Sequence, residues 1–590
     1  MIESRKRRIH KRSHTERLNR YLMRIAFLLG FLGVITLIYD LGFNKPQAIQ
    51  VMVYRIYLLA LSGGVVFIIS CYLFRKNRPR KKVWLVDAFL IFFYLVLLSR
   101  LFKWVNIDLL QMKLWINIAV IIVFVRELST FRIEFNKQYL NPAQLFILSF
   151  MTIIIAGTFL LMLPNSTYNG ILLVDALFTA TSAVCVTGLS VVDIGKFYTP
   201  LGQTIIMILI QAGGIGIMTF TSYFGYFFRG GASYQNRLMI QDMTNSERIA
   251  DVFSTLKKII LITFLIEILG ALIIYASLDR TILPGAGHRI FFSLFHSVSA
   301  FCNAGFSTLT NSLYETGFRF NYLLHLTIAG LIIIGGIGFP IVFNALTYLK
   351  HLLLNHTFKK RPIHAPWVIG INARIVLITT LLLLVIGTSL FYFLEYNNTL
   401  AEHKGIGKLA TAFFGATTPR TAGFNSVDTS ALNFSTIMVV FVLMWIGASP
   451  GSTGGGIKTS TFAIAILNFL SIAKGKDRIE IYKREISPIS ARRAFATLAL
   501  SLIVIGISVF FLAIFESGKD LMSLAFETVS AFGTVGLSLG ITSGLSDPGK
   551  IVIILTMFIG RVSMLTILVA FMRKIVNLKY KYPTEDVLIN

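Results

Sequence analysis

The sequence predicts an all-α polytopic membrane protein, in which four helix–pore-helix–helix repeats surround a central pore behind an N-terminal four-helix extension. Of the 590 residues, 55% are hydrophobic and only 14% are charged, whereas an average soluble domain is about 25% charged. Many apolar runs reach the roughly 20 residues that a membrane helix needs. Four Gly-centred loops, at Gly188, Gly305, Gly423 and Gly536, lie 117, 118 and 113 residues apart. A fixed period of this kind indicates repeated supersecondary units.

The basic residues indicate which loops face the cytoplasm. The net charge is +28, and Lys and Arg concentrate in alternate loops, at 75–82, 359–361 and 474–493. Cytoplasmic loops of membrane proteins carry such an excess. The basic tail, residues 1–24, is therefore expected inside the cell beside anionic membrane lipid. Because this distribution explains the charge, we expect no nucleic acid as a partner.

Residues 25–140 form the N-terminal transmembrane extension. Its apolar segments are expected at 25–43, 51–74, 83–102 and 104–127. A voltage sensor would need a helix with regularly spaced Arg residues. The cationic residues of the extension are scattered instead, so we do not expect it to sense voltage.

Each repeat is expected to contain an outer helix, a short apolar segment, a Gly loop and an inner helix. In the first repeat, residues 141–231, these helices are expected at 143–164, 171–184 and 200–228. The short segment is too brief to cross a bilayer, but a re-entrant helix is possible where it is buried in protein or lines an aqueous cavity. The later repeats are 257–350, 372–473 and 490–578, followed by a cytoplasmic tail, 579–590. Their outer helices are expected at 257–278, 374–395 and 491–515, their short segments at 288–302, 404–418 and 520–532, and their inner helices at 322–349, 434–472 and 550–575.

The four Gly loops have the features of a cation filter. A half-helix that ends at the pore centre directs the negative end of its dipole at the axis, which favours a cation. Glycine permits positive φ, so that successive carbonyl groups can face the pore and replace the hydration shell of a monovalent cation. No Asp or Glu lies within the four loop cores, which argues against a site for divalent ions. The candidate filter residues are Val186, Thr187, Gly188, Asn303, Ala304, Gly305, Thr421, Ala422, Gly423, Thr534, Val535 and Gly536.

A Gly-rich stretch, 447–458, interrupts the third inner helix, because consecutive glycines and a proline do not hold regular helix. It is not a phosphate-binding P-loop, since Ile457 separates Gly456 from Lys458 and no strand precedes it. Lys458 either reaches the cytoplasmic edge or contacts a gate. An Arg inside a membrane span is costly and functional by default, so Arg561 is either a charge at the pore or a structural group. The gate candidates are Gly454, Gly455, Gly456, Lys458 and Arg561.

Other ionisable residues have two interpretations each. Glu267 and Glu395 lie in outer helices and are expected to pair within the bundle rather than to contact ions. Asp193 and Asp428 follow two filter loops and either concentrate cations at the mouth or cap backbone amides. His296 stands alone before the second loop.

Several of these stretches together resemble the Trk/Ktr/HKT superfamily of potassium transporters, and the resemblance covers residues 141–578. The stretches that carry it are Val186–Ser190, Cys302–Phe306, Arg420–Phe424, Gly533–Leu537, Gly335–Pro340 and Ser452–Lys458. The resemblance implies K⁺ as the transported ion, a bacterial inner-membrane uptake protein, a homodimer with one pore per protomer, and a cytoplasmic nucleotide-binding regulatory subunit. It also implies that the Gly-rich stretch blocks the closed pore and that Arg561 is an electrostatic barrier beside it. In this family Ser at the first filter position accompanies sodium transport, so Gly188 is the potassium-like residue.

Two alternatives stay open. One is a sodium-selective or sodium-coupled transporter of the same superfamily, so that flux through a channel and symport both remain possible. The other is a polytopic membrane enzyme, which would need clustered His, Asp, Glu or Cys, whereas the nine His are dispersed. A membrane scaffold would leave the four Gly loops unexplained.

Overall fold

The computed structural model describes residues 2–74, 84, 87–95, 112–130, 142–216, 252–339, 341–345, 348 and 370–571. The basic loops expected at 75–82 and 359–361, part of the third apolar segment, the inner end of the first inner helix and the C-terminal tail lie outside these residues. The short basic hairpin of β1 (Glu480–Ile481) and β2 (Arg484–Glu485) lies within them.

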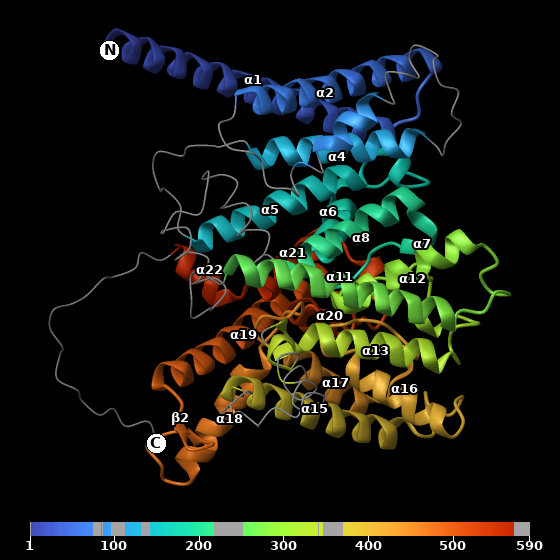
Figure 1. Ribbon diagram of the computed structural model, residues 1–590. Helices are drawn as coiled ribbons and strands as arrows, with labels where there is room; N and C mark the ends of the chain where they lie inside the picture. The colour runs from blue at the N-terminus through green and yellow to red at the C-terminus, as the bar shows by residue number, and fades with distance from the viewer. Residues whose placement is uncertain are drawn as a thin grey trace, which may run out of the picture.

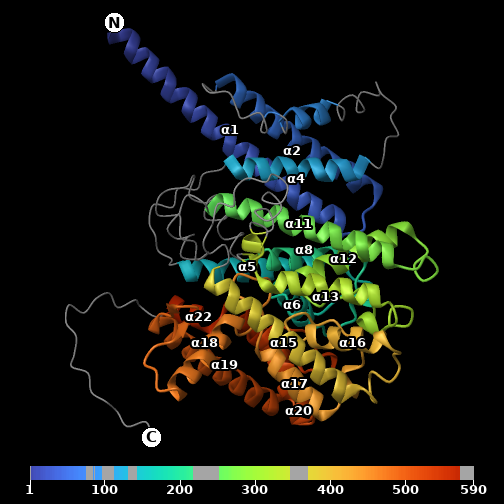
Figure 2. The ribbon, with the colours of Figure 1, turned by 60° about the horizontal axis from the view of Figure 1, so that its bottom comes forward.

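The N-terminal extension contributes α1 (Ile2–Gly42), α2 (Gln47–Phe74) and α4 (Met112–Thr130). The first helix is continuous, so the basic tail and the first apolar segment belong to one element rather than to two. Figures 1 and 2 both show these three helices on one side of the molecule, with α17 (Phe434–Trp445) toward the other. The extension meets the first repeat where Asn165 Nδ2 donates to the backbone oxygen of Leu41 at 3.0 Å.

A buried ion pair holds the extension together. Arg126 Nε lies 2.6 Å from Asp87 Oδ1, and its Nη1 lies 2.9 Å from Glu127 Oε1. Both carboxylates are buried. A charge in this setting is tolerated because it is paired and hydrogen-bonded.

Four repeats follow, each with an outer helix, a pore helix and an inner helix. The outer helices are α5 (Pro142–Leu161), α11 (Val252–Ser277), α15 (Ile371–Glu395) and α19 (Pro488–Phe515). The pore helices are α6 (Leu173–Val184), α12 (Ala286–Phe301), α16 (Ile406–Thr417) and α20 (Leu521–Gly533). The inner helices are α8 (Pro200–Gly214), α13 (Tyr322–Ile337), α17 (Phe434–Trp445) continued by α18 (Thr459–Ala473), and α21 (Asp547–Val562) continued by α22 (Met564–Phe571). The short helix α7 (Ile194–Phe197) follows the first filter loop.

The repeats close into a ring. The inner helix of each repeat packs against the pore helix of the next, in the pairs α8 with α12, α13 with α16, α17 with α20, and α21 with α6. The pore helices have 12 to 16 residues, so at about 1.5 Å per residue they are shorter than the roughly 30 Å hydrocarbon core. They can therefore enter the membrane but not cross it.

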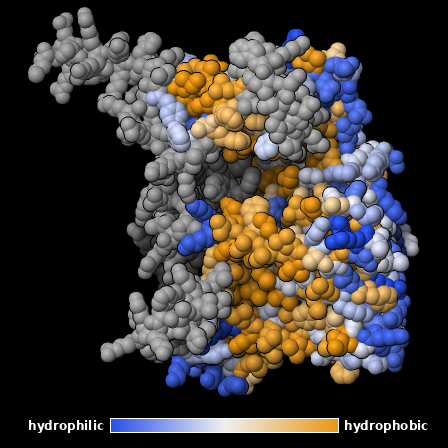
Figure 3. All heavy atoms as spheres, turned by 45° about the vertical axis from the view of Figure 1, so that its right-hand side comes forward, coloured by the Kyte–Doolittle hydropathy of each residue, from blue (hydrophilic) through white to orange (hydrophobic). Residues whose placement is uncertain are grey.

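Five described helices are long and apolar enough to cross a membrane. They are the segments Arg24–Gly42, Gln47–Ser70, Lys257–Ser277, Ile371–Glu395 and Pro488–Phe515. Figure 3 shows a broad area of hydrophobic side chains bordered by hydrophilic ones. Together with the ring of repeats, these features confirm the prediction of an all-α membrane protein with four pore repeats.

Three of the inner helices are interrupted within the described residues. The break between α17 and α18 falls at the Gly-rich stretch, as predicted. The second and fourth inner helices were expected to run unbroken through 322–349 and 550–575. Both predictions were wrong, because the second breaks at Gly338 with φ +95° and the fourth at Ser563 with φ +74°. In the first two repeats Gly216 and Gly338, each three residues after the first glycine of a Gly-Gly pair, also have positive φ, at +87° and +95°.

Candidate cation pathway

The four filter glycines contact one another in a closed ring. A Cβ atom added at Gly188 would lie 2.4 Å from the backbone oxygen of Ala304, and one at Gly536 would lie 2.2 Å from that of Thr187. The other two contacts continue the ring in chain order, at 2.4 Å from Gly305 to the oxygen of Ala422 and 2.2 Å from Gly423 to that of Val535. Each glycine thus lies against the carbonyl group that precedes the next glycine.

The backbone conformation repeats in all four loops. Each filter glycine has positive φ, between +69° and +94°, and so does the residue two positions before it. These residues are Val186, Asn303, Thr421 and Thr534, with φ from +50° to +70°. Positive φ is uncommon for any residue other than glycine, and for a β-branched residue it is an outlier. When left-handed and ordinary residues alternate, successive carbonyl groups turn to the same side of the chain, so backbone strain here accompanies a row of aligned oxygens.

Hydroxyl groups on the last turn of each pore helix hold the loops in place. Ser182 Oγ accepts from the Gly188 amide at 3.1 Å, and Ser530 Oγ accepts from the Gly536 amide at 3.1 Å. In the other two repeats the hydroxyl donates to the residue after the glycine, from Ser299 to the Phe306 oxygen at 2.8 Å and from Thr418 to the Phe424 oxygen at 2.7 Å. The Ser and Thr residues before each glycine therefore fix the loop.

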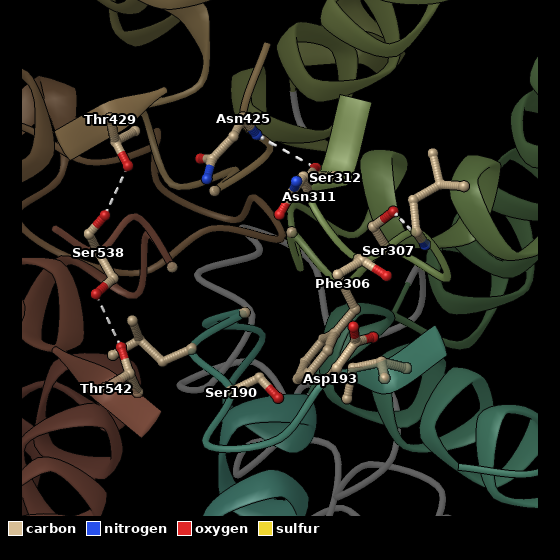
Figure 4. A pocket seen from close by; sticks show the side chains of 18 of the residues that line it. Ser190, Asp193, Phe306, Ser307, Asn311, Ser312, Asn425, Thr429, Ser538 and Thr542 are labelled. Carbon is tan, nitrogen blue, oxygen red and sulfur yellow. Dashed lines mark hydrogen bonds between the residues drawn. The ribbon is translucent and has the colours of Figure 1, made fainter. Parts of the chain in front are cut away.

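A vestibule of about 500 Å³ opens on one side of the glycine ring (Figure 4). Asp193 and Asp428 line it. Asp193 Oδ1 also accepts from the amides of Gly195 at 2.8 Å and Lys196 at 3.2 Å, and Asp428 Oδ1 accepts from the Ser430 amide at 3.0 Å. The structure thus confirms that both carboxylates cap backbone amides, and it places them in the lining of the vestibule.

The Gly-rich stretch, together with Ile446, forms the intramembrane loop (residues 446–458), which lies against the side of the filter opposite the vestibule. Its Thr453 Oγ1 lies 3.2 Å from Asn303 Oδ1 in the second filter loop. The Gly455 amide donates to Thr534 Oγ1 in the fourth at 3.0 Å. In the third filter loop, Thr421 Oγ1 would lie only 2.1 Å from a Cβ at Gly454. The loop therefore contacts three of the four filter loops directly.

Arg561 joins the intramembrane loop to the first repeat. Its Nη1 donates to the backbone oxygen of Thr453, and its Nη2 donates to that of Gly213 at 2.6 Å. Among the residues that the structure describes, it forms no ion pair. Lys458 Nζ donates to the Gly454 oxygen at 2.7 Å, so the lysine side chain binds the intramembrane loop itself.

Glu267 and Glu395 pair within the bundle, as expected. Gln211 Nε2 lies 2.9 and 3.0 Å from the two carboxylate oxygens of Glu267. Glu395 accepts from Asn398 Nδ2 at 2.8 Å and from the Asn433 amide at 2.9 Å. Among the described residues, no group of three or more His, Cys, Asp or Glu could hold a metal ion.

Some residues of this site had no recognisable signal in the sequence. Thr453 and Gly213 had no signal of their own, because their backbone oxygens are what Arg561 binds. Arg561 was predicted as a gate candidate, and an alignment of the inner helices also singles it out, because Gly560–Arg561 takes the place of Gly213–Gly214 and Gly335–Gly336. His296 was interpreted as standing alone, but its Nε2 lies 2.9 Å from Ser307 Oγ at the vestibule.

A ring of backbone carbonyl groups at the ends of four half-helices is typical of membrane proteins that conduct cations. The sequence profile of the TrkH family, described as cation transport protein, matches residues 110–579. The chain belongs to this family, so the resemblance found in the filter and loop motifs is confirmed. Members of this family are transport proteins and not enzymes.

Several relatives match most of the chain. Ktr system potassium uptake protein B of Bacillus subtilis is 38% identical over 451 residues, which cover 76% of this chain and 96% of the relative. Potassium/sodium uptake protein NtpJ of Enterococcus hirae is 35% identical over 463 residues, covering 77% and 98%. The crystal structure of the potassium transporter TrkH from Vibrio parahaemolyticus has a similar fold, with a TM-score of 0.58 at 17% identity, covering 88% of this chain and 97% of that one.

Proposed function

We propose that this protein takes up potassium ions across the inner membrane of a bacterium, through the glycine ring and past the intramembrane loop. The closed ring of four glycines with positive φ is the observation that carries this proposal. Carbonyl oxygens can replace the hydration shell of a monovalent cation, and each filter glycine leaves them no competing side chain. Gly188 at the first position is the potassium-like residue of the family, and the potassium uptake proteins among the relatives support K⁺ as the ion.

The intramembrane loop is proposed as the gate. It contacts three filter loops, while Arg561 links it to the fourth repeat and to Gly213 in the first. A loop that contacts three filter loops, and is tied to the first repeat through Arg561, blocks the path of an ion on this side of the filter. Because consecutive glycines hold no regular helix, the loop can move without unfolding a helix.

The orientation and partners are also proposals. The vestibule lies at one end of the repeats, and the basic hairpin of β1 and β2 follows α18 toward the other (Figure 1). Since basic segments face the cytoplasm, we place the vestibule outside, the N-terminus inside and the basic tail beside anionic membrane lipid. The family resemblance supports a homodimer and a cytoplasmic nucleotide-binding regulatory subunit.

A second candidate is uptake of both potassium and sodium, with or without sodium coupling. The potassium/sodium uptake protein of Enterococcus hirae, 35% identical over 463 residues, favours it. Both ions bind carbonyl oxygen, so the geometry of the ring accommodates either ion, and within the ring only the identity of Gly188 favours potassium.

Rubidium uptake into proteoliposomes tests the function. The purified protein should take up labelled rubidium under an imposed inside-negative potential, and external potassium should compete more strongly than sodium. Equal competition by the two ions would favour the second candidate. Uptake no faster than in empty liposomes would overturn both.

A further inference from the structure

Two pore helices carry a buried titratable side chain nine residues before the filter glycine. His296 precedes Gly305 in the second repeat, and Glu527 precedes Gly536 in the fourth. Both side chains are 0% exposed. The second and fourth repeats face each other across the ring, because the glycines contact one another in chain order.

Each of these side chains is linked to the serine two residues after the filter glycine. In the second repeat His296 Nε2 lies 2.9 Å from Ser307 Oγ. In the fourth, Glu527 Oε1 accepts from Thr542 Oγ1 at 2.5 Å, and that hydroxyl lies 2.9 Å from Ser538 Oγ. Figure 4 shows Ser307, Ser538 and Thr542 at the wall of the vestibule. Ser307 and Ser538 thus have equivalent positions, and each is hydrogen-bonded to the titratable side chain of its own pore helix, directly in the second repeat and through Thr542 in the fourth.

The hydrogen bonds fix the direction in which the Ser307 hydroxyl points. His296 Nδ1 lies 2.9 Å from the backbone oxygen of Phe292, and because a carbonyl can only accept, Nδ1 carries the proton. In neutral imidazole the other nitrogen is then an acceptor, so Ser307 donates its proton to Nε2. Ser307 Oγ also accepts from the Leu309 amide at 3.0 Å. One lone pair of this oxygen is left for the vestibule.

The fourth repeat reaches the same result with different groups. A carboxylate oxygen accepts and does not donate, so Thr542 donates its hydroxyl hydrogen bond to Glu527. Because this proton is used, the Thr542 oxygen accepts the hydrogen bond from Ser538. Ser538 Oγ accepts from the Gly540 amide at 3.0 Å, which is the counterpart of the Leu309 contact. The Ser538 hydroxyl proton therefore points to Thr542 and not into the vestibule, and one lone pair of the Ser538 oxygen is left for the vestibule.

The first and third repeats lack this arrangement. The residue nine positions before Gly188 is Thr179, whose hydroxyl donates within its own helix to the Asp175 oxygen at 2.9 Å. The equivalent residue of the third repeat is Phe414, which has no polar atom. The arrangement is therefore a property of one diagonal pair of repeats and not a general requirement for holding a pore helix.

We propose that His296 and Glu527 are positioning residues that turn the hydroxyl groups of Ser307 and Ser538 so that their oxygens attract a cation entering the filter. This inference rests on the proposed function, because it concerns the outermost cation contact of the same pathway. A hydroxyl that points its proton at the vestibule would repel the cation, whereas the observed orientation offers it two oxygens from opposite sides of the ring.

The test compares the KM and the maximal rate of rubidium uptake in proteoliposomes. His296→Phe keeps an aromatic ring, as in the third repeat, but removes the acceptor, and Glu527→Leu removes the other. Each should raise KM about fivefold, which corresponds to the roughly 1 kcal/mol of one hydrogen bond, with little change in maximal rate. Glu527→Gln should stay near the wild-type KM, because its amide oxygen still accepts. Thr179→Val is the control for loss of a polar group at the same helix position and should leave KM unchanged.

A double-mutant cycle separates positioning from packing. In a Ser307→Ala background, His296→Phe should raise KM no further, since no hydroxyl is left to orient. A further rise, an unchanged KM in the single variants, or a loss of maximal rate alone would overturn the inference. If wild-type protein takes up no rubidium, the proposed function fails instead. If His296→Phe does not yield monodisperse protein, Glu527→Leu, Glu527→Gln and Ser538→Ala decide the question in the fourth repeat by the same comparison.

Discussion

Arg561 of the fourth repeat donates a hydrogen bond from Nη2 to the backbone oxygen of Gly213 in the first, at 2.6 Å. Its Nη1 donates to the backbone oxygen of Thr453, so this one side chain holds the inner helices of two repeats and the intramembrane loop together. Both acceptors are uncharged carbonyl groups, so the guanidinium keeps its full positive charge beside the path proposed for the ion.

Arg561→Gln should therefore increase the flux of cations. A unit charge at about 5 Å, with an effective dielectric constant near 20, opposes a cation by roughly 3 kcal/mol. Half of that barrier would slow flux by about tenfold, because each 1.4 kcal/mol changes a rate by one decade. The measurement is the initial rate of rubidium uptake, and Arg561→Lys, which keeps the charge, should stay closer to wild type. A folded Arg561→Gln protein that conducts no faster would show that this arginine is a packing residue.

Gly188→Ser should weaken the discrimination of potassium from sodium. The new Cβ would lie 2.4 Å from the Ala304 oxygen, at a residue with φ +92°, so the ring of carbonyl groups must shift. We expect the ratio of potassium to sodium competition against rubidium uptake to fall by about tenfold, as for a distortion of about 1.4 kcal/mol.

Gly170→Ala is a matched control for this variant. Gly170 also has positive φ, at +76°, but no atom lies within 4 Å of its added Cβ. It should therefore show the effect of backbone strain without contact to the filter. The filter assignment fails if Gly188→Ser keeps wild-type selectivity, or if both variants lose selectivity equally.

Protonation of Glu516 in acid should reduce the stability of the protein at the end of α19. It follows the last residue of α19 and, although burial opposes its ionisation, hydrogen bonds from Lys519 and Ser546 hold its pKa below the usual 4.5. A carboxyl group with a lowered pKa in the folded state stabilises the protein above the unfolded-state pKa, and this contribution is lost as pH falls through the folded value. Glu516→Gln should reduce the free energy of unfolding at pH 7 by about 1 kcal/mol and so lower the midpoint of thermal unfolding. The difference from wild type should shrink as the pH falls below the usual carboxyl pKa of 4.5 and vanish below the lowered folded-state pKa. A difference that persists unchanged in acid would rule out the charge as its source.

The sequence predicted the local elements well. The pore helices lie within two residues of the expected segments, since each is an apolar run that ends in small residues and a glycine. The filter glycines and the interrupted third inner helix followed from composition and period. Domain boundaries and the roles of the filter and gate residues stay predictions.

The features that the sequence did not predict depend on contacts between distant residues or on unusual conformations. Thr453 and Asn303 are 150 residues apart in the chain, and neither residue type indicates the other. Ser563 takes a positive φ that sequence patterns reserve for glycine, so the break in the fourth inner helix had no local signal. His296 lacked a partner in sequence because Ser307 comes from beyond the filter turn.

Gly455→Ala should open the proposed gate. Gly455 lies directly under the fourth filter loop, where its amide donates to Thr534 Oγ1 at 3.0 Å, and an added Cβ would lie 2.3 Å from the same oxygen. Thr534 cannot easily move aside, because it belongs to the filter and has positive φ. The loop must therefore move away from the filter and lose this hydrogen bond, at a cost of about 1 kcal/mol or more.

If the loop closes the pore, this displacement should raise basal rubidium uptake about fivefold, by the same conversion of free energy to population. Gly330→Ala, in α13 with no atom within 4 Å of its added Cβ, should leave the basal rate unchanged and so controls for a glycine-to-alanine change in an inner helix. Replacing Gly454, Gly455 and Gly456 together should raise uptake further, and deleting the loop should raise it most. Displacing a loop that blocks the pore raises basal uptake, whereas displacing a merely structural loop does not. Basal uptake at or below the wild-type rate in all three loop variants would therefore remove the loop from the gating mechanism.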